Sequence, residues 1–114
     1  MQPNRPRARR FPFITSVEIT DLQTEVQTIE QLSDLSLFGC QVETAKPLPA
    51  GTRVRIRIVH KGETFAAMGK VANVRTNSGM GIVFSGIEEG AEIILEKWVA
   101  ELREHQERGP HGAS

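Results

Sequence analysis

A carboxylate, a hydroxyl and a glycine stand close together near the first third of the chain, at Asp34, Ser36 and Gly39. In an extended segment, residues two apart point to the same side, so Asp34 and Ser36 are expected to share one face. A carboxylate accepts hydrogen bonds from a pair of donors, and a neighbouring hydroxyl adds one more. This pattern predicts a strand start that displays a carboxylate and a hydroxyl side by side.

The apolar positions around this pattern change their parity. Leu35 and Leu37 are odd-numbered, whereas Cys40 and Val42 downstream are even-numbered. A β-bulge supplies the one extra residue that such a change needs, and glycine tolerates unusual backbone angles best. The sequence therefore predicts a kinked strand start with a bulge at Gly39.

The first ten residues carry four arginines and no acidic residue, although the formal net charge of the 114-residue chain is zero. The planar guanidinium fork binds phosphate or the O6/N7 edge of guanine in a bidentate way. A neutral chain does not favour non-specific binding to nucleic acid. A local positive segment at residues 1–10 therefore indicates a small anionic ligand rather than a polymer.

These two patterns together resemble the signatures of the PilZ domain family. Asp34-x-Ser36-x-x-Gly39 is similar to the second signature of that family, and Arg5 and Arg9, with Arg10 beside them, are similar to its Arg-x-x-x-Arg signature. The Gly-Met-Gly-Ile-Val-Phe run at residues 79–84 looks like the strand that closes this domain. The resemblance covers roughly residues 5–102.

The resemblance implies a small β-barrel that binds the bacterial second messenger cyclic di-GMP and has no cofactor. It implies a non-enzymatic receptor or adaptor that passes the signal to a downstream protein. In this family the glycine of the second signature lets the ligand approach the backbone closely. The ligand-binding residues implied for this chain are Arg5, Arg9, Arg10, Asp34, Ser36 and Gly39.

The family also implies a role for each side chain. Arg5 with Arg9 or Arg10 would clamp the ligand from the N-terminal segment, which would become ordered on binding. Asp34 would accept from guanine N1–H and N2–H₂, a donor pair that adenine lacks, and Ser36 would add a hydrogen bond. The spacing of the Arg-x-x-x-Arg signature selects Arg5 and Arg9, whereas the arginine directly before the first strand is Arg10. Which of Arg9 and Arg10 corresponds to the second arginine of the signature therefore stays open.

Two other functions are compatible with the sequence. A PilZ-like domain that has lost ligand binding would act as a protein-interaction module, in pilus or motility machinery. A nucleic-acid-binding barrel would use the exposed stripe of Arg53, Arg55 and Arg57, but no aromatic residues interleave with it as single-strand platforms require. Phe38 either stacks on a ligand or packs against the barrel.

The elements that position these residues are short strands joined by turns, typical of an antiparallel barrel. After Gly86 an apolar stripe of helical period predicts a C-terminal helix whose Trp98 face covers one side or end of the barrel. We predict an all-β fold with six strands, one helix and a flexible Arg-rich arm. The expected division is arm 1–10, barrel 11–85 and helix 86–106 within one domain 1–106, followed by a disordered tail 107–114. The expected strands are 11–19, 24–33, 39–44, 53–59, 63–75 and 80–84.

Composition excludes several classes of protein. The single cysteine, Cys40, excludes an internal disulfide framework and a cysteine-based zinc site, and it is expected to be a buried core residue. Three scattered histidines without neighbouring ligands predict no metal site. No catalytic constellation is present, so we expect no enzyme. The absence of an 18-residue apolar run and of a signal-peptide core predicts a cytoplasmic protein.

Overall fold

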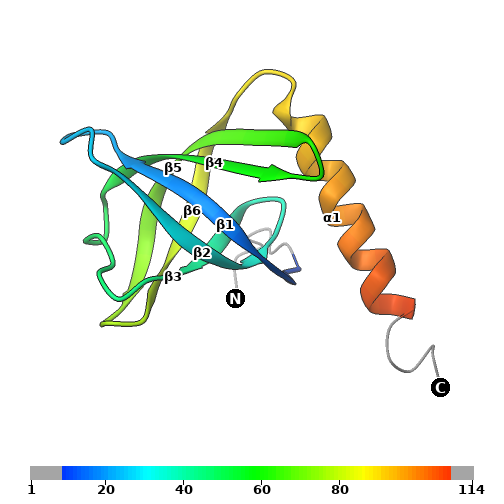
Figure 1. Cartoon of the computed structure of the whole chain (residues 1–114), viewed down its shortest axis with the longest axis horizontal. Helices are drawn as coiled ribbons and strands as arrows, with labels where there is room; N and C mark the ends of the chain where they lie inside the picture. Colours follow the sequence, from blue (N-terminus) through cyan, green and yellow to red (C-terminus); the bar gives the residue numbers. More distant parts are fainter. Residues whose placement is uncertain (1–8, 109–114) are drawn as a thin grey trace, which may run out of the picture.

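The computed structural model describes residues 9–108, and these form a closed β-barrel with one helix beside it (Figure 1). Neighbouring strands follow the ring order β1-β2-β3-β6-β5-β4, and every pair is antiparallel. The predicted fold class of six antiparallel strands and a C-terminal helix is confirmed. The elements are β1 Phe11–Asp21, β2 Gln27–Leu35, β3 Gly39–Glu43, β4 Arg53–His60, β5 Glu63–Arg75, β6 Gly79–Ile87 and α1 Ala91–Arg108.

Alternation of apolar and polar residues builds the barrel wall. In β4, Val54, Ile56 and Ile58 are fully buried, while the arginines between them are exposed. Closure of the ring pairs every strand on both sides, which removes the unpaired edges that favour aggregation. The prediction that Cys40 is a buried core residue is also confirmed.

One irregularity of the barrel wall lies within β2. Leu32 and Leu35 are both completely buried although they are three residues apart, and the β2–β3 register shifts between Leu32 and Asp34. An extra residue in this stretch turns the second leucine back to the core. At Gly39 the pairing with β2 and β6 has no register shift, so the bulge predicted there is wrong; the chain reverses between Ser36 and Gly39, and this reversal changes the parity.

The helix α1 packs against β5 and β1, with Trp98 and Leu95 almost fully buried (Figure 1). The indole of Trp98 packs edge-on against Phe13 and His60, and its Nε1 donates to Glu63 Oε1 at 3.2 Å. The predicted contact between the Trp98 face and the barrel is thus present. Within residues 9–108, the chain has no helix that is long and apolar enough to cross a membrane.

The element boundaries near the C-terminus differ from those predicted. β6 continues to Ile87 rather than 85 because Gly86 and Ile87 still pair with β5. The helix begins at Ala91 rather than 86, after Gly90 has turned the chain with φ at 85°. It runs to Arg108 rather than 106, so residues 107 and 108 are helical and not part of a disordered tail. Residues 1–8 of the predicted arm and 109–114 of the predicted tail lie outside the described residues.

Candidate ligand-binding site

The Asp34–Gly39 stretch covers the end of β2, the turn at residues 36–38 and the first residue of β3, and Ser36 holds this turn together. The Ser36 Oγ accepts hydrogen bonds from the backbone N–H of Phe38 and of Gly39, each at 3.1 Å, and donates to the Gly39 carbonyl at 3.2 Å. The Ser36 N–H donates to the same carbonyl at 2.9 Å. Ser36 is only 4% exposed, so Asp34 and Ser36 do not lie side by side on an exposed strand as predicted.

We expect Ser36→Ala to lower the free energy of unfolding by about 1–2 kcal/mol, because two backbone N–H groups lose their acceptor in a half-buried turn. Urea unfolding followed by circular dichroism measures this loss. Ser85→Ala, at an exposed serine of β6, is the matched control and should change stability by less than about 0.5 kcal/mol. Equal stability of the two variants would contradict the structural role of the Ser36 hydroxyl.

Gly39 is required for a close approach of two strands rather than for an unusual backbone angle. It is not among the residues with positive φ. A Cβ at this position would collide with the backbone carbonyl oxygen of Ile82 on β6. Any larger residue would push β3 away from β6 at the foot of the turn.

Asp34 carries a carboxylate that is partly removed from water. Its Oδ1 is buried and has no hydrogen-bond partner among the described residues. Burial raises the pKa of the carboxyl above its usual value, while the charges of Arg10 and Arg75 and a backbone hydrogen bond from Gln41 act in the opposite direction. A buried acceptor without a donor is costly, so Asp34 has an unused capacity to accept a hydrogen bond.

The side chains of Arg9 and Arg10, which directly precede β1, lie in different surroundings. The Arg9 guanidinium lies over the ring of Phe11, 5.0 Å from its centroid, and Arg103 of α1 lies 5.8 Å from the same ring. Arg10 is close enough to act electrostatically on Asp34. The structure therefore associates Arg10, and not Arg9, with Asp34, while Arg5 lies outside the described residues.

A row of polar residues on β3, β6 and β5 extends the site, and sequence analysis did not identify it. Asp34 pairs with Gln41, Gln41 with Gly81, and Gly81 with Asn73. Gln41 Oε1 accepts a hydrogen bond from Arg75 Nη1 at 2.6 Å. Gly81 adds no side chain, so the polar groups of this row are Asp34, Gln41, Asn73 and the nearby Arg75, and only the register distinguishes them from other outward-facing positions.

The exposed arginine stripe on β4 is largely neutralised by acidic residues. Arg55 Nη2 lies 2.9 Å from Glu88 Oε2, and Arg57 Nη1 lies 3.7 Å from Glu18 Oε1. Both pairs are exposed and contribute little to stability, but they reduce the local positive potential. This stripe is a poor surface for a nucleic-acid backbone.

Phe38 is 51% exposed on the β2–β3 turn, so it does not belong to the barrel core. Of the two interpretations of this residue, packing against the barrel is disfavoured. An exposed aromatic ring on the turn that follows Asp34 in the chain is suited to contact a planar base.

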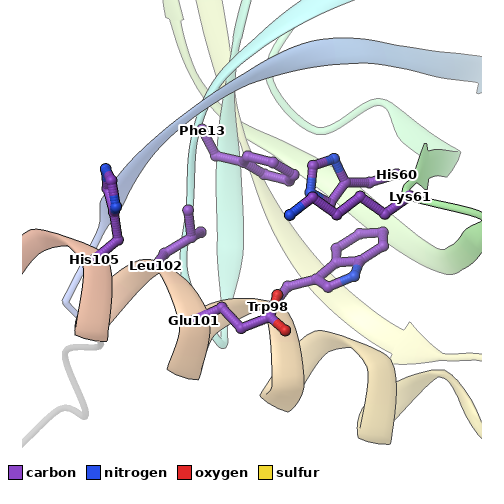
Figure 2. A pocket seen from close by; sticks show the side chains of 7 residues that line it. All are labelled: Phe13, His60, Lys61, Trp98, Glu101, Leu102 and His105. Carbon is purple, nitrogen blue, oxygen red and sulfur yellow. The ribbon is translucent and has the colours of Figure 1, made fainter.

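A pocket of about 360 Å³ lies between the barrel and α1, and none of residues 34–39 lines it (Figure 2). The pocket runs along the contact between α1 and the barrel. The aromatic rings of Phe13, His60 and Trp98 form one wall of the pocket (Figure 2). The part of the chain that the structure describes contains no group of three His, Cys, Asp or Glu side chains that could hold a metal ion. The residues that line the pocket are Phe13, His60, Lys61, Trp98, Glu101, Leu102 and His105.

Comparison with known proteins supports the family resemblance. The family model described as "PilZ domain" matches residues 4–101. A search of curated proteins found no match. The PilZ domain of CeSA from a cellulose-synthesizing bacterium is similar to this chain with a TM-score of 0.66 at 24% identity, over 83% of this chain and 98% of that chain.

Two further solved structures have the same fold. The PilZ domain of YcgR from Escherichia coli, solved with c-di-GMP, superposes with a TM-score of 0.72 at 21% identity, over 92% of this chain and 95% of that chain. The inhibitor of motility MotI/DgrA from Bacillus subtilis gives a TM-score of 0.75 at 18% identity, over 94% of this chain. This chain covers 55% of MotI/DgrA, which is therefore the longer protein.

Proposed function

The chain belongs to the PilZ domain family, and from this premise we propose that it is a non-enzymatic receptor for cyclic di-GMP. The observation that carries the proposal is the carboxylate of Asp34, which has a buried oxygen without a donor among the described residues and is subject to the charge of Arg10. A guanine base supplies the missing donors through N1–H and N2–H₂. The ligand phosphates supply the negative charge that the arginines attract.

The residues of the second signature have different tasks in this proposal. Asp34 contacts the guanine, whereas Ser36 shapes the turn, because its hydroxyl is already engaged by backbone groups. Gly39 keeps β3 close to β6. The exposed ring of Phe38 offers a face for one of the bases.

The arginines of the N-terminal segment close over the ligand from the side of β1. Arg10 is the second arginine of the clamp, because it already acts on Asp34, and Arg5 or Arg7 is the first. Ordering a segment costs roughly 1–2 kcal/mol per residue, so several charge-assisted contacts are needed to offset it. The closed segment then presents a new surface to a downstream protein.

Isothermal titration calorimetry with cyclic di-GMP tests this proposal. Wild-type protein should bind saturably, and Arg10→Ala should weaken binding by about 10- to 100-fold, the loss expected for one bidentate arginine contact. Arg9→Ala should have a smaller effect, because the Arg9 guanidinium lies over Phe11. Arg5→Ala and Arg7→Ala identify the first arginine.

A second function is favoured by one observation. The four-residue spacing selects Arg5 and Arg9, but the Arg9 guanidinium lies over Phe11. If Arg10 does not take the place of Arg9, the clamp does not form, and the barrel acts as a protein-interaction module without a ligand. Absence of any heat of binding at micromolar concentrations of wild-type protein would support this function and reject the receptor.

A further inference from the structure

The outer wall of the barrel presents a cation beside Asp34 that the two sequence signatures do not contain. Arg75 stands near the end of β5, two residues after Asn73, and its side chain reaches across β6 to β3. There, Nη1 donates to Gln41 Oε1 at 2.6 Å, a bond between residues 34 positions apart in the chain. Gln41 is only 7% exposed although its chain neighbours Cys40 and Val42 occupy the core, so Gln41 is covered on the outer face.

Gln41 is itself held in place. A Cβ at Gly81 would come within 2.8 Å of Gln41 Nε2 and 2.9 Å of the Asn73 amide, which shows that both side-chain amides lean over this glycine. The Ser33 hydroxyl donates to the Gln41 backbone carbonyl at 3.3 Å. The partner of Arg75 is thus a packed side chain on a rigid sheet, so the guanidinium is pre-organised at little cost in entropy on binding.

The charge of Arg75 is not neutralised by this partner. Among the described residues, the ion pairs engage Arg55 and Arg57 of the barrel wall and Lys97 of α1, whereas the hydrogen bond of Arg75 goes to a neutral amide. The charge of Arg75 favours the ionised form of Asp34, as does the charge of Arg10. The carboxylate of Asp34 is therefore subject to the charge of two guanidinium groups, Arg10 from the N-terminal segment and Arg75 from the barrel wall.

We propose that Arg75, positioned by Gln41, is a further ligand-binding residue of the cyclic di-GMP site and contacts a phosphate or a base from the barrel side. This inference rests on the proposed function. A ligand with two phosphates and two guanines offers acceptors on more than one side, and a guanidinium matches both kinds of acceptor. The rigid wall supplies one cation, and the N-terminal segment supplies the others.

Calorimetry with cyclic di-GMP on the full chain tests the role of Arg75. We expect Arg75→Gln to weaken binding about 10-fold, with a circular dichroism spectrum equal to that of wild type. Arg53→Gln is the matched control, because Arg53 is exposed on β4, the strand opposite β3 in the ring, and it should leave the affinity unchanged. Equal affinity of wild type and Arg75→Gln would overturn the inference while the proposed function stands; absence of binding by wild type would overturn both.

A double-mutant cycle distinguishes positioning by Gln41 from a purely structural role. Gln41→Leu removes the acceptor that holds Arg75 and should weaken binding about 3- to 10-fold in the wild-type background. In the Arg75→Gln background the same change should have almost no further effect, because residues that act as a unit are not additive. Additive losses, or an unchanged affinity of Gln41→Leu, would contradict positioning through Arg75.

Discussion

Asp34→Ala is expected to weaken cyclic di-GMP binding by about 100-fold while the barrel remains folded. The carboxylate is the acceptor proposed for the guanine N1–H and N2–H₂ groups, and a paired contact of this kind is worth roughly 1–3 kcal/mol. Removal of the carboxylate also removes its electrostatic attraction for the donor groups of the base. Titration calorimetry measures the loss, with Glu89→Gln on the loop before α1 as a control for a change of one charge.

The nature of the base gives an independent check of this prediction. Wild-type protein should bind cyclic di-GMP much more tightly than cyclic di-AMP, because adenine lacks the donor pair that the carboxylate requires. In the Asp34→Asn variant the discrimination should shrink, since an amide presents one acceptor and one donor group. Equal affinity of wild type for both dinucleotides would reject Asp34 as the base-reading residue.

The ionised carboxylate of Asp34 is expected to favour ligand binding but to lower the stability of the ligand-free fold. Burial raises the pKa of this carboxyl in the folded state, so the ionised form costs stability above that pKa. As the pH falls through the folded pKa toward the unfolded value, the carboxyl takes up a proton and this cost disappears. Asp34→Asn should therefore melt at the same temperature as wild type or higher at pH 7, and the difference should vanish in acid.

A lower melting temperature of Asp34→Asn at pH 7 would show that the carboxylate stabilises the fold. Asp34 would then be a structural residue of the β2–β3 connection. Thermal unfolding at pH 7 and at pH 4, followed by circular dichroism, separates these two roles. The ligand-free protein is used for both measurements.

The fold was predictable because its signals are local. Alternation in Arg53–His60 and the helical stripe around Trp98 each follow from residues close together in the chain. The bulge was misplaced because the parity change between Leu37 and Cys40 comes from the chain reversal at Ser36, whereas the extra residue lies upstream, between Leu32 and Asp34. A bulge and a tight reversal both change the parity and both favour glycine, so the parity change alone did not distinguish them.

The candidate site was only partly predictable for a related reason. Asp34 and the arginines of the first ten residues belong to short motifs that can be recognised in order along the chain. Gln41 and Arg75 are 34 residues apart and meet only because β6 lies between β3 and β5 in the ring. A contact across a closed barrel depends on strand order and register, which a single sequence does not specify.

The largest loss of stability is expected from Trp98→Ala, at about 3–5 kcal/mol of the free energy of unfolding. Trp98 is 2% exposed and contacts Phe13, His60 and Phe65, so its truncation leaves a cavity between α1 and the barrel. Glu63 also loses the indole donor. Because domains of this size are stable by roughly 5–15 kcal/mol, the variant should be close to unfolding at 37 °C.

Urea unfolding measures this loss, and two variants of the same helix calibrate it. Trp98→Phe keeps most of the apolar volume and should lose less than half as much, while Ile93→Ala, at a side chain that is 70% exposed, should lose less than about 0.5 kcal/mol. If Trp98→Ala were no less stable than Ile93→Ala, α1 would not be part of the cooperative unit. The barrel would then unfold alone, and the helix would be available to detach when a partner binds.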